Sequence, residues 1–159
     1  MRKTVVGIIG GRVVETKVEE QAIKLAKSLA KVVDYMVCGG LSGAMKAVSQ
    51  GFKQGGGTTI GILPGYDKKE ANQYVDIVIP TGMGLARNVL VVKTADVVVA
   101  LPGQAGTLSE IAYCLQFGIP VISLQSWKIP GVIQVRTVEE AVARVKRIMV
   151  SLRAHITKE

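Results

Sequence analysis

The segment LPGQAGTLSEI, at positions 101–111, brings glycines, a threonine and a carboxylate together directly after the apolar run ADVVVA. If a helix begins here, its free backbone N–H groups and the positive end of its dipole form an anion-binding site. Gly103 and Gly106 allow the backbone to turn N–H groups towards a ligand, and the Thr107 hydroxyl can donate to a phosphate oxygen. The segment can therefore form a phosphate-binding loop that presents Glu110 to the ligand.

A structural alternative explains two of the same residues. Thr107 and Glu110 have the spacing of a capping box, in which the two side chains satisfy backbone N–H groups at the helix start. Such a cap stabilises a helix by about 0.5–2 kcal/mol, which is sufficient reason for both residues. The segment alone favours neither interpretation. The glycine-rich ends of the other apolar runs favour the ligand site.

Apolar runs alternate with amphipathic segments along the chain and indicate the elements that position this loop. Strands are predicted at 4–11, 35–40, 58–65, 76–82, 96–103 and 119–124, with a candidate edge strand at 131–135, and helices at 16–33, 42–57, 84–94, 106–117 and from 137 onward. Strands that are apolar on both faces must be covered on both faces. We predict an α/β fold of Rossmann-like type, a three-layer, doubly wound, mostly parallel sheet, as one domain over residues 1–159.

Polar residues at the starts of these elements have structural explanations. Thr16 with Glu19, and Thr137 with Glu140, have capping-box spacing. Aspartates at or just before strand starts lie away from the expected ligand edge and are assigned to turns and caps: Asp34, Asp76 and Asp96.

Glycines gather where most predicted strands end. In open α/β sheets, ligands bind beyond the carboxyl ends of the strands. A single cluster is explained by a tight turn, but repetition along one sheet edge favours close approach of the backbone to a ligand. The clusters are Gly10-Gly11, Gly39-Gly40, Gly65, Gly82–Gly84, and Gly103 with Gly106.

Several other sites are disfavoured. No strand end has the G-x-G-x-x-G dinucleotide spacing, and no G-x-x-x-x-G-K-[ST] motif occurs. The single histidine, His155, is expected to be a solvated residue near the C-terminus. Cys38 and Cys114 lie far apart inside apolar segments, so buried thiols of a cytoplasmic protein are expected and a metal site is not.

The net charge of +8 favours an anionic partner. The basic residues form no dense block, and the seven aromatic residues do not alternate with them, so nucleic acid is less favoured than a small anionic ligand. No apolar run reaches the roughly 18 residues that a membrane helix needs. The N-terminal MRKTVVGIIGG is interpreted as a first strand and not as a signal peptide.

The segments CGGLSGAMKAVSQG, GMGLARN and LPGQAGTLSE occur in this order. Together they resemble the family once mislabelled lysine decarboxylases, which includes the Lonely Guy cytokinin-activating phosphoribohydrolases and the molybdenum cofactor carrier proteins. The wider superfamily also includes the DNA-processing protein that loads recombinase onto single strands. The resemblance extends from the first strand to about Leu124, and the short chain and the GLARN form are closer to the carrier proteins.

The resemblance implies roles for individual residues. It places the hydrolase arginine at Arg87 and the glutamate at Glu110, as a catalytic pair. Two departures put hydrolysis in doubt: Gln104 replaces the second glycine of the phosphate loop, and Asn88 replaces the lysine that usually follows the arginine. The candidate ligand-binding residues are Gly10, Gly39, Gly40, Gly43, Met45, Gly84, Asn88, Pro102, Gly103, Gln104, Gly106 and Thr107.

Three functions remain open. The first is a carrier for a phosphorylated heterocycle, either a nucleotide or the pterin-type molybdenum cofactor, with no cofactor required by the protein itself. The second is a nucleoside 5′-monophosphate phosphoribohydrolase, in which Glu110 stabilises the oxocarbenium-like ribose and Arg87 holds the phosphate or assists the departing base. The third is single-stranded nucleic-acid binding.

A homo-oligomer, either a dimer or a tetramer, is also expected. The segment IAYCLQFGIPV is apolar almost all round, so its helix needs burial on more than its sheet side. The family resemblance likewise implies at least a dimer. We predict that the helices from Gly84 and from Gly106 lie at or near the interface.

Overall fold

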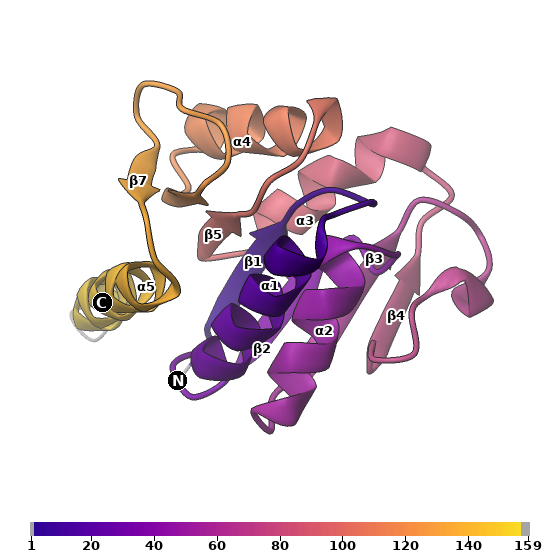
Figure 1. The fold of residues 1–159 in the computed structure, drawn as a ribbon, viewed down its shortest axis with the longest axis horizontal. Coiled ribbons are helices and arrows are strands. Elements are labelled where there is room, and N and C mark those ends of the chain that lie inside the picture. Colours follow the sequence, from indigo (N-terminus) through magenta and orange to yellow (C-terminus); the bar gives the residue numbers. More distant parts are fainter. Residues whose placement is uncertain (1, 157–159) are drawn as a thin grey trace.

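The computed structural model describes residues 2–156, and the side chains of residues 2–154. Figure 1 shows strands and helices alternating along this range. The strands are β1 (Val5–Ile9), β2 (Tyr35–Cys38), β3 (Thr58–Leu63), β4 (Ile77–Pro80), β5 (Val97–Ala100), β6 (Val121–Leu124) and β7 (Ile133–Val135). The helices are α1 (Thr16–Leu29), α2 (Ala44–Gln54), α3 (Asn88–Thr94), α4 (Ala105–Phe117) and α5 (Val138–Ile156), with short 3-10 helices η1 (Lys68–Glu70) and η2 (Gly84–Arg87).

Within residues 2–156 the seven strands form one sheet in the order β4-β3-β2-β1-β5-β6-β7, and every neighbouring pair is parallel. The candidate edge strand at 131–135 is thus present as β7. The chain first builds outward from β1 to β4 and then crosses back to β5 on the other side of β1. The boundary between β1 and β5 is therefore the switch point at which open α/β sheets bind ligands.

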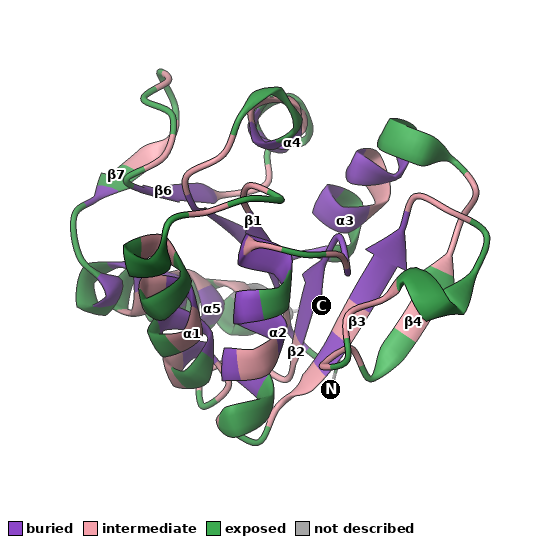
Figure 2. Cartoon of the chain, turned by 45° about the vertical axis from the view of Figure 1, so that its right-hand side comes forward, coloured by how far each residue is buried: buried purple, intermediate pink, exposed green. Residues whose placement is uncertain are grey.

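Helices cover both faces of the sheet, as predicted for strands that are apolar on both sides. Helices α1, α2 and α5 pack over one face, and α3 and α4 over the other (Figure 1). The inner stripe of α1 lies in the first core as expected, with Ala22, Leu25 and Leu29 fully buried. Figure 2 shows the contrast between the buried central strands and the edge strand β4, whose residues are exposed or half-buried.

The predicted helix 84–94 is divided. Its first turn is the 3-10 helix η2, and the α-helical part begins at Asn88. The cap predicted at Thr16 is wrong, because α1 begins at Thr16 itself after Glu15, with no side-chain cap. The cap at the start of α5 is confirmed: the Glu140 N–H donates to the Thr137 hydroxyl at 3.1 Å.

Asp34, Asp76 and Asp96 accept backbone hydrogen bonds at the amino ends of the strands, opposite the ends that carry the glycines. Each precedes a strand and accepts a backbone N–H within one residue of the start of the neighbouring strand, so its carboxylate fixes the start of strand pairing. The pairs are Asp34 with Thr4 (2.8 Å), Asp76 with Thr59 (3.0 Å) and Asp96 with Val5 (2.9 Å). No helix in residues 2–156 is long and apolar enough to cross a membrane.

Candidate functional site

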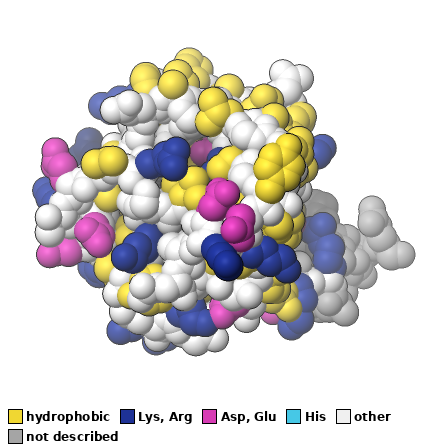
Figure 3. All heavy atoms as spheres, turned by 90° about the vertical axis from the view of Figure 1, so that its right-hand side faces the viewer, with side chains coloured by type: hydrophobic (Ala, Val, Ile, Leu, Met, Phe, Trp, Pro, Cys, Tyr) yellow, Lys and Arg dark blue, Asp and Glu magenta, His cyan; other side chains and the backbone are white. Residues whose placement is uncertain are grey.

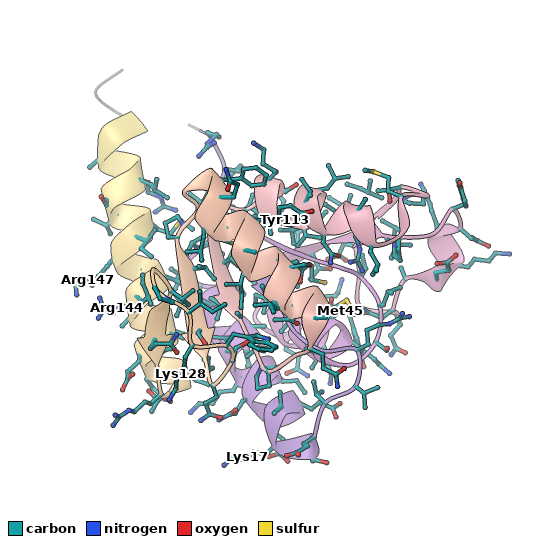
Figure 4. All side chains as sticks on the ribbon, turned by 90° about the horizontal axis from the view of Figure 1, so that it is seen from above. Lys17, Met45, Tyr113, Lys128, Arg144 and Arg147 are labelled. Atoms are coloured by element: carbon teal, nitrogen blue, oxygen red, sulfur yellow. The ribbon has the colours of Figure 1, made fainter. Side chains whose placement is uncertain are left out.

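A cavity of about 350 Å³ lies at the switch point, beyond the carboxyl ends of β1, β2 and β5. In Figure 4, Met45 of α2 lies beside the start of α4, and both border this cavity. The volume is in the range of about 300–1,000 Å³ typical of small-molecule sites. The lining comprises residues 8–13, Gly39, Leu41, Met45, Pro64, Leu85, Arg87, Asn88, Gly103, Gln104, Gly106, Thr107 and Glu110.

The predicted phosphate loop is the entrance to α4. The helix begins at Ala105, after Gln104 in the N-cap position, and no side chain caps it. Within the described part of the chain, the N–H groups of Ala105, Gly106 and Thr107 donate to no acceptor. The cavity therefore faces the start of a helix whose first N–H groups are free, the arrangement that binds anions.

Thr107 faces the cavity from inside the first turn of this helix. Its side chain is only 3% exposed, and it lies too far into the helix to serve as the N-cap residue. The capping-box interpretation of Thr107 and Glu110 is therefore wrong. Gly103 packs directly against Thr107, because a Cβ at position 103 would lie 2.0 Å from the Thr107 Oγ1. A glycine at 103 is thus required for this close approach.

The guanidinium of Arg87 is held by backbone oxygens. Its Nε–H donates to the Ile62 carbonyl at 2.7 Å and an Nη2–H to the Gly39 carbonyl at 3.2 Å. Gly39 leaves the necessary room, since a Cβ there would lie 2.5 Å from Nη2. Burial lowers the pKa of Arg87, against the opposing effect of the Glu110 charge. The group nevertheless remains a cation, because arginine titrates far above physiological pH.

Asn88 connects this arginine to the phosphate loop. Its Oδ1 accepts a hydrogen bond from Arg87, and its Nδ2 donates to the Ser109 hydroxyl at 3.3 Å. Ser109 in turn donates to the Gly106 carbonyl at 2.7 Å. The residue that replaces the usual lysine thus adds no charge. It joins Arg87 to the first turn of α4.

Glu110 is buried in the cavity wall without a partner among the described residues. Its side chain is 7% exposed, no described group donates to it, and it forms no ion pair with Arg87. Burial raises the pKa of Glu110 to about 8, and the positive charge of Arg87 only partly opposes this. At neutral pH the carboxyl is therefore mostly protonated, and it presents an O–H donor to the cavity.

Both cysteines are free and buried, as expected. Burial raises the pKa of Cys38, and it raises the pKa of Cys114 to about 12, so both remain neutral thiols. Within residues 2–154, no three His, Cys, Asp or Glu side chains are grouped so that they could hold a metal ion. The His155 side chain lies outside the described residues.

Most of the predicted site residues come together in the cavity, but four do not line it. Gly40 and Gly43 shape the loop between β2 and α2, Gly84 begins η2, and the Pro102 carbonyl accepts the Gly11 N–H at 3.0 Å. The residues that line it are Gly10, Gly39, Met45, Arg87, Asn88, Gly103, Gln104, Gly106, Thr107 and Glu110.

Sequence reasoning missed the residues at the cavity mouth. Arg12 adds a second guanidinium to the lining, and the apolar side chains of Val13 and Leu85 are 92% and 81% exposed. A signal for Arg12 was present, because it directly follows the Gly10-Gly11 pair at a predicted strand end. Val13 and Leu85 carried no comparable signal, since isolated apolar residues in loops have no periodicity.

Comparison with known proteins places this geometry in a family. The profile of the SLOG cluster4 family matches residues 3–152. An uncharacterized protein of Archaeoglobus fulgidus is 36% identical over 143 residues, which cover 89% of this chain and 94% of that protein. A probable cytokinin riboside 5′-monophosphate phosphoribohydrolase of Oryza sativa subsp. japonica is 35% identical over 95 residues, 58% of this chain and 42% of that protein.

Two solved structures share the fold over nearly their whole length. The molybdenum cofactor binding protein of the phototrophic bacterium Rippkaea orientalis has a TM-score of 0.87 at 33% identity, covering 94% of this chain and 99% of that chain. The molybdenum cofactor carrier protein of Chlamydomonas reinhardtii has a TM-score of 0.86 at 31% identity, with the same coverage. Since the family profile also extends over almost the whole sequence, this chain belongs to the SLOG cluster4 family.

Proposed function

We propose that this protein is a carrier that binds a phosphorylated heterocyclic ligand, either a nucleotide or a pterin-type molybdenum cofactor. The observation that carries the proposal is the start of α4, where free N–H groups and the Thr107 hydroxyl line one cavity. The phosphate binds there. The two solved relatives, which are a molybdenum cofactor binding protein and a carrier protein, support a ligand of this class.

The residues at the mouth of the cavity suit the heterocyclic part of the ligand. Arg12 supplies a cation there, and the exposed side chains of Val13 and Leu85 supply apolar surface. A flat ring that extends outward from the phosphate removes this apolar surface from water, which is favourable in proportion to the area covered. A ligand with a charged end and a ring system fits both parts.

The state of Glu110 favours binding over hydrolysis. Cleavage of an N-glycosidic bond places positive charge on the ribose, and an ionised carboxylate stabilises that charge. Glu110 is mostly neutral at pH 7, because burial raises its pKa to about 8. As a donor, it instead suits a ring nitrogen or a carbonyl oxygen of the ligand. Gln104 adds a side chain to the cavity lining, where the hydrolase pattern has glycine.

A phosphoribohydrolase is the second candidate. The observation that favours it is the placement of Arg87 and Glu110 in one cavity, together with the similarity to the Oryza sativa protein. In this case activity requires the ionised form of Glu110 and rises as pH increases through about 8. The carrier function predicts no turnover at any pH.

One experiment separates the two candidates. The protein is titrated with AMP by isothermal titration calorimetry, and the same mixtures are analysed chromatographically for free adenine at pH 7 and pH 9. The carrier proposal expects binding and intact AMP at both pH values. Release of adenine that increases at pH 9 would identify the hydrolase. Heat-treated protein serves as the control for spontaneous cleavage.

We also propose that the protein forms a homo-oligomer, a dimer or a tetramer, through α4 and η2. The buried side of α4 faces the sheet, whereas Leu115 and Phe117 on the same helix remain exposed. Met83, directly before η2, is also exposed. Figure 3, which shows the molecule from the side of β4, has hydrophobic side chains gathered along the top of that face. A second copy that covers these side chains removes them from water.

A further inference from the structure

The segment between β6 and β7 lies against the phosphate loop. Trp127, the only tryptophan in the sequence, donates from its Nε1–H to the Gly103 carbonyl at 3.1 Å. Its side chain is not part of the cavity lining, although Gly103 and Gln104 are. The indole therefore contacts the loop from outside the ligand space.

Hydrogen bonds fix this segment on both sides of the tryptophan. The Ser126 N–H donates to the Ser123 hydroxyl at 3.2 Å, and the Gln134 side chain donates to the Trp127 carbonyl at 3.2 Å. Gln125 has a φ of 57°, a left-handed conformation that non-glycine residues rarely adopt. This residue turns the chain at the end of β6. These contacts fix the backbone at Trp127, and its 39% exposed side chain reaches the loop through the Nε1–H.

The contact between Trp127 and the Gly103 carbonyl determines the orientation of the peptide bond between Gly103 and Gln104. In a planar trans peptide, the carbonyl of one residue and the N–H of the next point in opposite directions. Because the Gly103 carbonyl points towards Trp127, the Gln104 N–H points to the other side of the loop. Gly103 has no Cβ to restrict this peptide, so a neighbour must select its orientation.

We propose that Trp127 is a positioning residue that holds the loop at 103–104 in its anion-binding conformation. The inference rests on the proposed phosphate site at the start of α4. Trp127 acts through Gly103 and does not touch the ligand. Without the indole N–H, the peptide bond between Gly103 and Gln104 is free to rotate. The ligand must then order the loop again, and the free energy that this requires weakens binding. Because the indole contacts the loop itself, its fluorescence also reports occupancy of the site.

The test uses inorganic phosphate and AMP as probes. Titration of the wild-type protein, excited at a wavelength selective for tryptophan, is expected to change the emission with the same midpoint as the calorimetric isotherm. Trp127→Phe keeps an aromatic ring but removes the N–H donor, and it is expected to weaken both probes by about 3- to 10-fold. Ser126→Ala is the matched control on the same segment. It removes a buried hydroxyl that has no partner among the described residues, and it leaves affinity unchanged.

The outcomes separate the two claims. If the wild type binds neither probe, both the phosphate site and the role of Trp127 are overturned. If it binds, but the emission does not respond and Trp127→Phe binds equally well, only the role of Trp127 is overturned. Thermal unfolding of each variant is measured in parallel. A weaker affinity of Trp127→Phe at an unchanged melting temperature supports positioning, and equal affinity overturns it whether or not the wild-type emission responds.

Discussion

Arg87 and Glu110 face one cavity without forming an ion pair. Arg87 donates to the carbonyl oxygens of Ile62 and Gly39, and no described residue donates to Glu110. The pocket therefore combines a fixed cation with a carboxyl group that burial keeps mostly neutral at pH 7. Pairing these groups with each other would remove both from the ligand. Their separation leaves each available to bind.

Glu110→Gln is expected to stabilise the protein, increasingly so at high pH. The folded-state pKa of about 8 lies above the ordinary value of 4.5, so the native state binds the proton more tightly than the unfolded state. The contribution of Glu110 to the free energy of unfolding is greatest below about pH 4.5, and it falls as the pH rises towards 8. Glutamine cannot ionise, and because the two pKa values differ by about 3.5 at about 1.4 kcal/mol each, its advantage is expected to reach on the order of 5 kcal/mol at pH 9.

Urea unfolding at pH 5, 7 and 9 checks this. Glu139→Gln is the control, because Glu139 is an exposed carboxylate paired with Lys24. A Glu110→Gln protein that is less stable than wild type at pH 9 contradicts a raised pKa of Glu110. Ligand affinity of the variant is expected within a few-fold of wild type, since glutamine resembles the protonated acid in shape.

Thr107→Val tests the phosphate site. Valine keeps the shape of threonine but removes the hydroxyl donor, so anion binding is expected to weaken by roughly 1–3 kcal/mol, as for a lost charge-assisted hydrogen bond. Thr94→Val is the matched control, because the Thr94 hydroxyl donates only to the Leu90 carbonyl at the far end of α3. Calorimetric titration with AMP measures both. Equal affinities of wild type and Thr107→Val would place the anion elsewhere.

Much of this account could be predicted from the sequence. Apolar runs separated by amphipathic segments predict the order and type of the elements, because burial on both faces leaves few alternatives for such strands. Since parallel strands end at one sheet edge, the glycine clusters that follow them predict a cavity there. The sequence pattern thus places Gly10, Gly39 and Gly103 together without any knowledge of distance, and the family resemblance adds Arg87.

The remaining features depend on tertiary contacts that no spacing rule contains. The capping-box spacing of Thr107 and Glu110 did not show that α4 begins at Ala105, which turns both side chains to the cavity. The link from Asn88 to Ser109 joins residues on two helices. The approach of Trp127 to Gly103 comes from an irregular segment, in which there is no periodicity to interpret.

Gln104→Gly tests whether Arg87 and Glu110 can cleave AMP once the side chain at position 104 is removed. Removing the side chain restores the glycine of the hydrolase pattern at a residue that lines the cavity. The carrier function predicts no free adenine from AMP at pH 7 with either wild type or this variant. Adenine release by Gln104→Gly alone, measured by liquid chromatography, would show that Gln104 suppresses an active catalytic pair.

Leu115→Lys tests the proposed interface. Leu115 is exposed on α4, and a lysine there places charge in the middle of an apolar contact. The wild type is expected to be at least a dimer by light scattering at micromolar concentration, and the variant a monomer. Val150→Lys on α5, a more exposed apolar position on the other side of the sheet (67% against 37% for Leu115), is expected to leave the mass unchanged. A monomeric wild type contradicts the proposal.

Identification of the bound molecule tests the central claim most directly. The wild type and Thr107→Val are purified in parallel from cells that make molybdenum cofactor, and the small molecules released on denaturation are quantified by liquid chromatography–mass spectrometry. The account predicts that the wild type releases an intact phosphorylated heterocycle, nucleotide or pterin, and that Thr107→Val releases much less. A wild type that releases no phosphorylated compound, or a Thr107→Val protein that releases as much as the wild type, would contradict it.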